Sequence, residues 1–264
     1  MGNIKIESLF IETTQDERQI RILLPDNYQN SKIRYPVLYM HDGQNLFDDE
    51  TSAAGQSWNI NDTLKILLEK NIIRDIIVVG IDNSNLRLFE YSPWESSELV
   101  KYISEVPVGG LGDIYAQFVV EKVKPYIDKN YRTKKDYHHA MIAGSSMGAY
   151  ISAYIAIKYP GVFQHVGIFS LASWFNEGDF LKFINSSTID TNQRFFISIG
   201  SNESSREATT DFNEIYLQNS RNLLSILKNK KVKDILYIET DDIHHESAWK
   251  KVFVDFIRFA HQKS

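Results

Sequence analysis

The feature that most constrains this chain is a Gly-x-Ser-x-Gly motif, Gly144 to Gly148, directly after an apolar run. A serine hydroxyl is a weak nucleophile at neutral pH, so an enzyme presents it on a sharp turn between a strand and a helix, within reach of a base. Ser146 is the serine of this motif, and its flanking glycines suit a chain that doubles back tightly. Residues 150–158 then have the composition of a helix that ends near Pro160. The alternative interpretation is a glycine-flanked turn whose serine has no chemical role.

Composition limits the class of protein. The chain has 264 residues, of which 43% are hydrophobic, and no segment resembles a linker, so we expect one domain over residues 1–264. The absence of Cys excludes thiol catalysis, disulfides and cysteine-ligated metal. A formal net charge of -5 with mixed signs gives no basic stripe, so we expect no nucleic-acid partner.

The N-terminal residues carry charge where a signal peptide has an apolar core, and no apolar run approaches the length that spans a membrane. We therefore expect a soluble, cytoplasmic protein without a membrane partner. The sequence gives no indication of the oligomeric state.

Hydrophobic periodicity predicts an α/β fold. Alternation over residues 4–12 and 18–24 predicts an antiparallel hairpin at one edge of a sheet. Continuous apolar runs predict strands buried on both faces, and helical spacing predicts amphipathic helices between them. The strands are expected at 35–40, 76–81, 140–145, 165–170, 194–200 and 235–239, and the helices at 60–70, 113–126, 150–158, 212–227 and 249–260. We expect a mostly parallel sheet with an antiparallel N-terminal edge and helices on both faces.

Three stretches are less regular. Pro125 is expected to limit the helix that begins at Asp113. Residues 82–110 form a long segment without a clear period, which is more typical of a binding element or lid than of a simple connection. An irregular stretch containing Trp174 and Phe175 is expected between two of the strands.

Catalytic groups gather at the carboxyl ends of parallel strands, and a nucleophilic Ser146 needs an acid and a histidine there. On a sheet of this kind the expected chain order is serine, acid, histidine. Glu203 follows one strand end and His244 follows the last strand, so we assign Glu203 as the orienting carboxylate and His244 as the general base. Other candidates lie close by, namely Glu207, Asp241 and Asp242 for the acid and His245 for the base.

Further groups complete the expected site. The backbone N–H of Met147, after the nucleophile, and that of Gln44, in the loop after the 35–40 strand, are the expected oxyanion donors. An ordinary glycine-containing turn is the alternative for that loop. Four aromatic residues are candidates for lining an acyl or aryl pocket, although loop aromatics are often simply packed: Trp58, Tyr91, Trp94 and Trp174. The histidines lack metal-ligand spacing, so no metal or cofactor is expected.

These motifs together resemble the putative-esterase branch of the α/β-hydrolase superfamily. This group includes enterochelin, feruloyl and acetyl xylan esterases, S-formylglutathione hydrolases and mycolyltransferases. The resemblance covers nearly the whole chain and is carried by Val37–Asp48, Gly80–Asn83, Glu90–Pro93, Tyr131–Thr133, Ala143–Gly148 and His244–Trp249.

The resemblance implies an α/β-hydrolase fold and a serine hydrolase that acts on small-molecule carboxylic esters. It favours His244 over His245, because His244 occupies the place of the family's catalytic histidine, and it supports Glu203 as the acid. Two departures stand out: Leu171 replaces a usual proline, and Asp242 places an extra carboxylate beside His244. An acyltransferase with the same triad and a non-catalytic binding protein on the same scaffold remain open alternatives.

Overall fold

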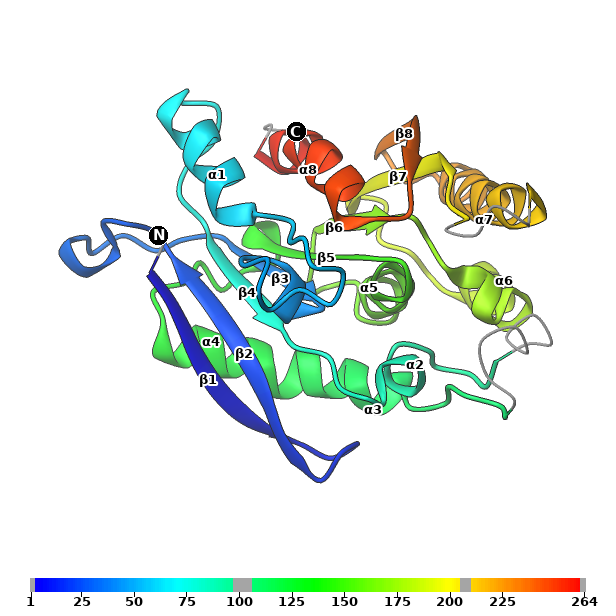
Figure 1. The fold of residues 1–264 in the computed structure, drawn as a ribbon, viewed down its shortest axis with the longest axis horizontal. Coiled ribbons are helices and arrows are strands. Elements are labelled where there is room, and N and C mark those ends of the chain that lie inside the picture. Colours follow the sequence, from blue (N-terminus) through cyan, green and yellow to red (C-terminus); the bar gives the residue numbers. More distant parts are fainter. Residues whose placement is uncertain (1–2, 97–105, 205–209, 262–264) are drawn as a thin grey trace.

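The computed structural model describes residues 3–96, 106–204 and 210–261. One eight-stranded sheet runs through it in the order β1-β2-β4-β3-β5-β6-β7-β8 (Figure 1). The strands are β1 (Asn3–Ile11), β2 (Asp16–Leu24), β3 (Val37–His41), β4 (Ile77–Ile81), β5 (Ala140–Ser145), β6 (His165–Phe169), β7 (Arg194–Asn202) and β8 (Asp234–Ile243).

The sheet is antiparallel only at its N-terminal edge. β1 pairs with β2 and β2 with β4 in antiparallel fashion, whereas every pair from β4 across to β8 is parallel. The expected α/β fold with its antiparallel N-terminal edge is therefore confirmed.

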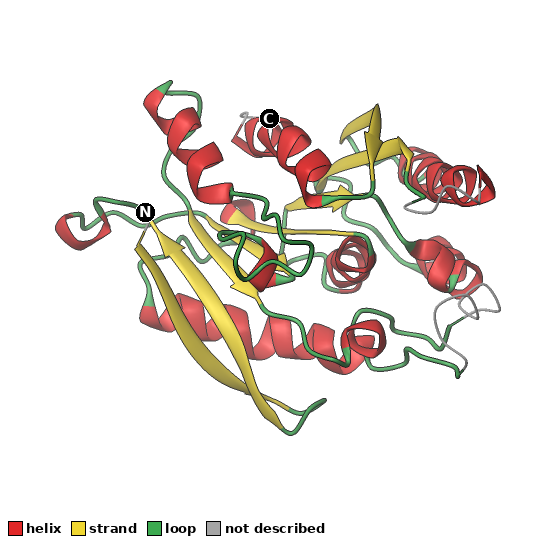
Figure 2. Cartoon of the chain, viewed as in Figure 1, coloured by secondary structure: helices red, strands yellow, loops and turns green. Residues whose placement is uncertain are grey.

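Helices cover both faces of the sheet (Figure 2). They are α1 (Ile60–Glu69), α2 (Arg87–Glu90), α3 (Gly112–Gln117), α4 (Lys124–Asn130), α5 (Met147–Lys158), α6 (Glu177–Ser186), α7 (Thr210–Asn229) and α8 (Glu246–His261). Across the described residues, no helix combines the length and apolar composition needed to cross a lipid bilayer.

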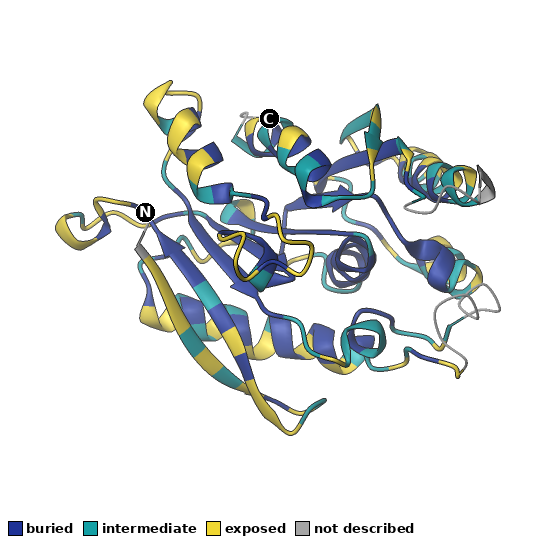
Figure 3. Ribbon diagram, in the orientation of Figure 1, coloured by how far each residue is buried: buried dark blue, intermediate teal, exposed yellow. Residues whose placement is uncertain are grey.

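The two faces of the sheet carry separate cores, which explains the continuous apolar runs in the sequence. Along β3, Val37 and Tyr39 point into a core shared with α5, while Leu38 and Met40 point into a core shared with α1 and α8. The central strands are accordingly buried along their length, and exposure returns on β1 at the edge (Figure 3).

The helix expected from Asp113 does not end at Pro125, contrary to the sequence prediction. α3 continues through a π-helical segment, Phe118–Val123, into α4, which ends at Asn130. There the Lys124 N–H donates to the carbonyl of Val119, five residues back. The ladder is thus already displaced by one residue when it reaches the proline, whose missing N–H would interrupt an ordinary α-helix.

The stretch around Trp174 is also more regular than expected. A short 3-10 helix, Ser173–Phe175, leads into α6, and the Asn176 side chain accepts a hydrogen bond from the Asp179 N–H at the start of that helix. Phe180 and Ile184, one helical turn apart, face the core. Of the long segment expected as a binding element, the described part contains α2, while residues 97–105 lie outside the described residues.

Candidate active site

Ser146 stands alone between β5 and α5, in a backbone conformation that side chains rarely adopt. Its φ is 58° and its ψ is -123°, a strained combination that costs on the order of 1–3 kcal/mol. A Cβ atom on Gly144 would lie 2.6 Å from the carbonyl carbon and oxygen of Gly148, so strand and helix approach each other too closely for any side chain there. The turn presents Ser146, partly exposed, at the first residue before α5.

His244 and Glu203 meet at the carboxyl ends of β7 and β8. His244 Nδ1 lies 2.5 Å from Glu203 Oε2, and the Glu203 side chain has no exposed surface. The other carboxylate oxygen accepts hydrogen bonds from the Gly200 N–H at 2.7 Å and from Ser170 Oγ at 2.6 Å. An Nδ1–H that donates to the carboxylate leaves the lone pair of His244 on Nε2, the tautomer a general base needs.

Ser170 is a site residue that the sequence analysis treated only as a strand end. It follows β6 with a φ of 51°, is 2% exposed, and accepts a hydrogen bond from the Trp249 indole N–H at 2.9 Å. Because Ser170 Oγ then donates to Glu203, the order of donation runs from Trp249 through Ser170 to the carboxylate. Its position one residue past a buried parallel strand was the available signal.

The other candidate acids and base face elsewhere. The Asp242 carboxylate accepts a hydrogen bond from Lys251 Nζ at 2.5 Å, and Asp241 is exposed. Glu207 lies outside the described residues. His245 Nδ1 lies 3.0 Å from Ser247 Oγ, at the start of α8. The extra carboxylate of Asp242 thus pairs with a lysine.

Tyr216 of α7 contacts both Ser146 and His244, and the sequence analysis placed it only on the apolar face of a helix. Its ring centroid is 5.0 Å from that of His244. Ser146 and Trp174 are neighbours of its hydroxyl, and burial raises the pKa of Tyr216 to about 12. Ser146 and the His244–Glu203 pair therefore share one neighbouring side chain.

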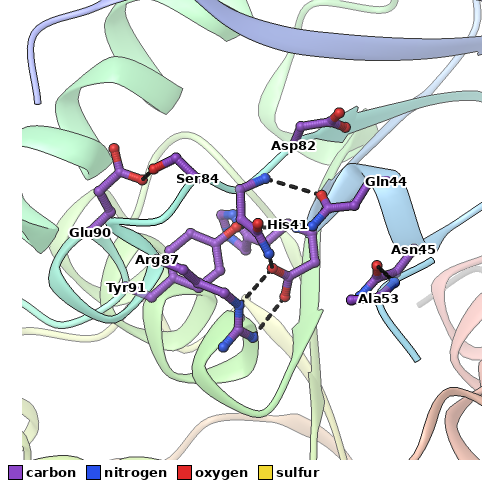
Figure 4. Close-up of polar contacts among 12 residues, drawn as sticks. His41, Gln44, Asn45, Ala53, Asp82, Ser84, Arg87, Glu90 and Tyr91 are labelled. Atoms are coloured by element: carbon purple, nitrogen blue, oxygen red, sulfur yellow. Dashed lines mark hydrogen bonds and ion pairs between the residues drawn. The ribbon is translucent and has the colours of Figure 1, made fainter. Parts of the chain in front are cut away.

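The loop after β3 packs against the start of α5. Asp42 has a left-handed φ of 56°, and its Oδ2 would lie 3.3 Å from a Cβ atom on Gly148. Gln44 follows in a short 3-10 helix, Gly43–Asn45, and its side-chain oxygen accepts a hydrogen bond from the Asn83 N–H at 3.1 Å (Figure 4). The loop that carries Gln44 thus adjoins the turn that carries Ser146.

A partly buried ion pair holds this loop in place. Arg87 of α2 donates two hydrogen bonds to the Asp42 carboxylate, at 2.7 and 2.8 Å, and its guanidinium lies over the Tyr91 ring (Figure 4). The pKa of the Asp42 carboxyl is lowered by Arg87, against the opposing effect of burial. The Tyr91 hydroxyl in turn accepts a hydrogen bond from the Asp42 N–H at 3.2 Å. Asp42 directly follows β3, and Arg87 belongs to the helix after the neighbouring strand β4, so this bidentate pair joins the carboxyl ends of two parallel strands.

The four aromatic residues expected in a pocket lie in different surroundings. Trp58 is 2% exposed and packs against Phe169, Trp249 and Phe253, and Tyr91 is completely buried beneath Arg87. Trp94 is partly exposed and contacts Tyr150 and Tyr154. Trp174 is 6% exposed. Its ring contacts Tyr216, which is also a neighbour of Ser146.

Comparison with known proteins gives consistent matches over the chain. The family model described as "Putative esterase" matches residues 11–259. "Uncharacterized protein YbbA" of Bacillus subtilis (strain 168) is 25% identical over 250 residues, which cover 94% of each chain.

Solved structures share the fold. A ferulic acid esterase superposes with a TM-score of 0.74 at 18% identity, over 99% of this chain and 98% of its own. Enterochelin esterase from Shigella flexneri superposes with a TM-score of 0.75 at 16% identity, over 98% of this chain and 58% of its own.

Proposed function

The chain belongs to the Putative esterase family and is a carboxylesterase-type hydrolase, and on that premise we propose that it cleaves carboxylic esters through Ser146, His244 and Glu203. We also propose that residues 1–264 form one esterase domain. The observation that carries the catalytic proposal is the 2.5 Å contact between His244 Nδ1 and the buried Glu203 carboxylate, beside a serine held at a strained turn.

The proposed reaction proceeds through an acyl-enzyme. His244 Nε2 takes the proton of Ser146 as Oγ attacks the ester carbonyl, and the imidazolium then gives that proton to the departing alcohol. Water activated by the same imidazole hydrolyses the acyl-enzyme. Glu203 keeps its negative charge throughout and stabilises the imidazolium that forms twice per turnover.

The proposed oxyanion hole consists of the backbone N–H groups of Met147 and Gln44. Two observations support it: Met147 is the first residue of α5, whose N-terminus is a favourable place for negative charge, and the Gln44 loop packs against that terminus. Loss of one such donor typically costs about 2.7–4 kcal/mol of transition-state stabilisation.

The natural ester is proposed only as a small molecule. Relatives bear the names ferulic acid esterase and enterochelin esterase, so aromatic acyl groups belong in a substrate panel. Trp94 and Trp174 are the aromatic residues we propose for a pocket. We leave Trp58 and Tyr91 out of it because their rings are buried by the contacts described above.

The test is hydrolysis of p-nitrophenyl esters from acetate to long acyl chains, together with methyl ferulate. We expect turnover by the wild type and loss of about 10⁶-fold in kcat for Ser146→Ala, the size of loss seen when a triad serine is removed. Ser145→Ala is the matched control, since Ser145 is a buried serine one residue earlier, and it should retain activity.

The outcomes separate the alternatives. Equal rates for the wild type and Ser146→Ala would contradict the proposal. An inactive wild type that also fails to react at Ser146 with a serine-directed phosphonate would indicate a binding protein on this scaffold. Ester exchange in preference to hydrolysis when an alcohol is added would assign acyl transfer to the same triad.

A further inference from the structure

The chain just after β6 is hydrogen-bonded to the strands on both sides of it. The Ser146 N–H, after β5, donates to the Phe169 carbonyl at 2.9 Å, and the Ala172 N–H donates to the Ser146 carbonyl at 3.4 Å. On the other side, the Ser170 N–H donates to the Ser198 carbonyl of β7 at 2.8 Å. Since β6 lies between β5 and β7, these bonds fix Ser170 between the nucleophile and the acid of the proposed triad.

The neighbours of the Ser170 hydroxyl fix the direction of its proton. An indole N–H can only donate, so Ser170 Oγ is the acceptor in its 2.9 Å hydrogen bond with Trp249. The single hydroxyl proton is then left for Glu203 Oε1, at 2.6 Å. Ser170 is 2% exposed and the Glu203 side chain has no exposed surface, so bulk water does not compete for this bond.

Trp249 of α8 also restrains the histidine. Its ring meets the His244 ring edge to face, with centroids 5.0 Å apart and an angle of 86° between the planes. The indole is itself stacked on Trp58, with centroids 5.7 Å apart, and is 6% exposed. A single buried ring therefore packs against the imidazole and, through Ser170, directs a proton to the carboxylate that binds it.

We propose that Ser170 is a positioning residue: oriented by Trp249, it holds the Glu203 carboxylate in the rotation that receives the Nδ1–H of His244. This role rests on the proposed function. Oε1 accepts from both the Ser170 hydroxyl and the Gly200 N–H, which leaves Oε2 directed at Nδ1. Without the hydroxyl, Oε1 keeps one of these two donors, and the carboxylate can rotate away from the imidazole.

The experiment compares kcat and KM of the wild type and Ser170→Ala with p-nitrophenyl acetate. We expect kcat to fall by about 10–100-fold, the range found when outer partners of metal-site ligands are removed. KM should change little, because Ser170 acts on the base and does not touch the substrate. Ser152→Ala is the matched control: Ser152 is a completely buried serine of α5 whose hydroxyl donates to a helix carbonyl at 2.7 Å, and both constants should stay near those of the wild type.

A double-variant comparison shows whether Ser170 acts through Glu203. In a Glu203→Gln background the carboxylate is already absent, so adding Ser170→Ala should cost little further kcat. A merely structural role for the hydroxyl would cost the same in both backgrounds.

Trp249→Phe tests the same chain of hydrogen bonds from its other end, and it serves if Ser170→Ala folds poorly. It keeps an aromatic ring beside His244 but removes the N–H that directs the Ser170 proton, so we expect a smaller loss of kcat, and again little further loss when Glu203 is Gln. An unchanged kcat in the folded variants, or equal losses with and without the Glu203 carboxylate, would overturn the inference while leaving the triad intact. An inactive wild type would instead contradict the proposed function.

Discussion

Glu203 accepts hydrogen bonds from the Gly200 N–H, Ser170 Oγ and His244 Nδ1. A buried carboxylate needs such donors, because an ionised group in a low-dielectric interior is costly unless each lone pair finds a partner. Gly200 has a second constraint: a Cβ atom there would lie 2.3 Å from the Asp242 carbonyl oxygen and 3.1 Å from Glu203 Oε1. The glycine therefore allows β8 and the carboxylate to come close enough for His244 to reach Glu203.

Replacing Glu203 by Gln tests whether Glu203 is the acid of the proposed triad. If the Gln amide donates its N–H to Nδ1, the imidazole proton must sit on Nε2, which is the wrong tautomer for a general base. The amide also has no charge to stabilise the imidazolium. We expect kcat to fall by about 10³–10⁴-fold with little change in KM, as for loss of the triad acid elsewhere. Asp242→Asn should retain most of its activity, because Asp242 pairs with Lys251. A larger loss for Asp242→Asn or for Glu207→Gln would identify a different acid.

Some residues of the site can be predicted from the sequence and others cannot. Ser146 and His244 stand in local motifs whose spacing reflects their chemistry, and Glu203 stands next to a strand end. Ser170 and Tyr216 carry no such local signal. Ser170 acts through a carboxylate 33 positions away, and Tyr216 fits an apolar helix face as well as it fits a catalytic site. Only the pairing of β6 with β7, and the packing of α7, reveals their contacts.

The turn between β5 and α5 depends on the close approach of Gly144 to Gly148. A Cβ atom on Gly144 would collide with the backbone of Gly148, which cannot rotate away as a side chain can. We expect Gly144→Ala to lower the melting temperature by several degrees, through about 1–3 kcal/mol of overpacking, and to reduce kcat strongly by displacing Ser146. Gly161→Ala is the control, because a Cβ atom there meets nothing within 4 Å. Equal activity in the two variants would show that the turn tolerates a side chain.

Errors in the predicted elements have local physical causes. Proline interrupts an α-helical ladder, so the sequence predicts a helix end at Pro125, but a π-helical segment before it shifts the ladder and lets the helix continue to Asn130. α6 is not predicted, because two aromatic residues preceding it obscure the helical spacing of Phe180 and Ile184. The strands of the parallel sheet were easier to predict, because burial on both faces leaves continuous apolar runs.

Two ion pairs, one buried and one partly buried, join the antiparallel edge of the sheet to the site. Arg18 of β2 donates to both oxygens of the completely buried Glu90 carboxylate, at 3.1 and 2.9 Å, and Glu90 ends the helix that carries Arg87. Arg87 in turn holds Asp42 beside the start of α5. The hairpin at the edge of the sheet is thus connected, through two ion pairs, to the loop next to the catalytic serine.

Two buried histidines should make the stability of the whole molecule depend on pH. Burial lowers the pKa of His41 to about 4 and that of His165 to about 3, whereas an unfolded histidine titrates near 6.5. Below about pH 6.5 the unfolded chain therefore binds protons that the folded chain does not, and stability falls as the pH falls. Between pH 7 and pH 5 we expect each histidine to remove about 2 kcal/mol from the free energy of unfolding. Urea denaturation at several pH values measures this.

A variant separates these histidines from other titrating groups. His165 is 6% exposed, and its Nε2 lies 3.3 Å from the His138 carbonyl oxygen, so a leucine fills the space at little cost. His165→Leu should lose about half as much stability as the wild type between pH 7 and pH 5, because His41 then remains the main contributor, with a smaller contribution from His261, whose pKa is also lowered by burial. Parallel curves for the two proteins would mean that His165 is protonated in the folded state. A free energy of unfolding that does not change with pH in the wild type would contradict both assignments. Each assignment requires the histidine to bind a proton in the unfolded chain and to stay neutral in the folded one.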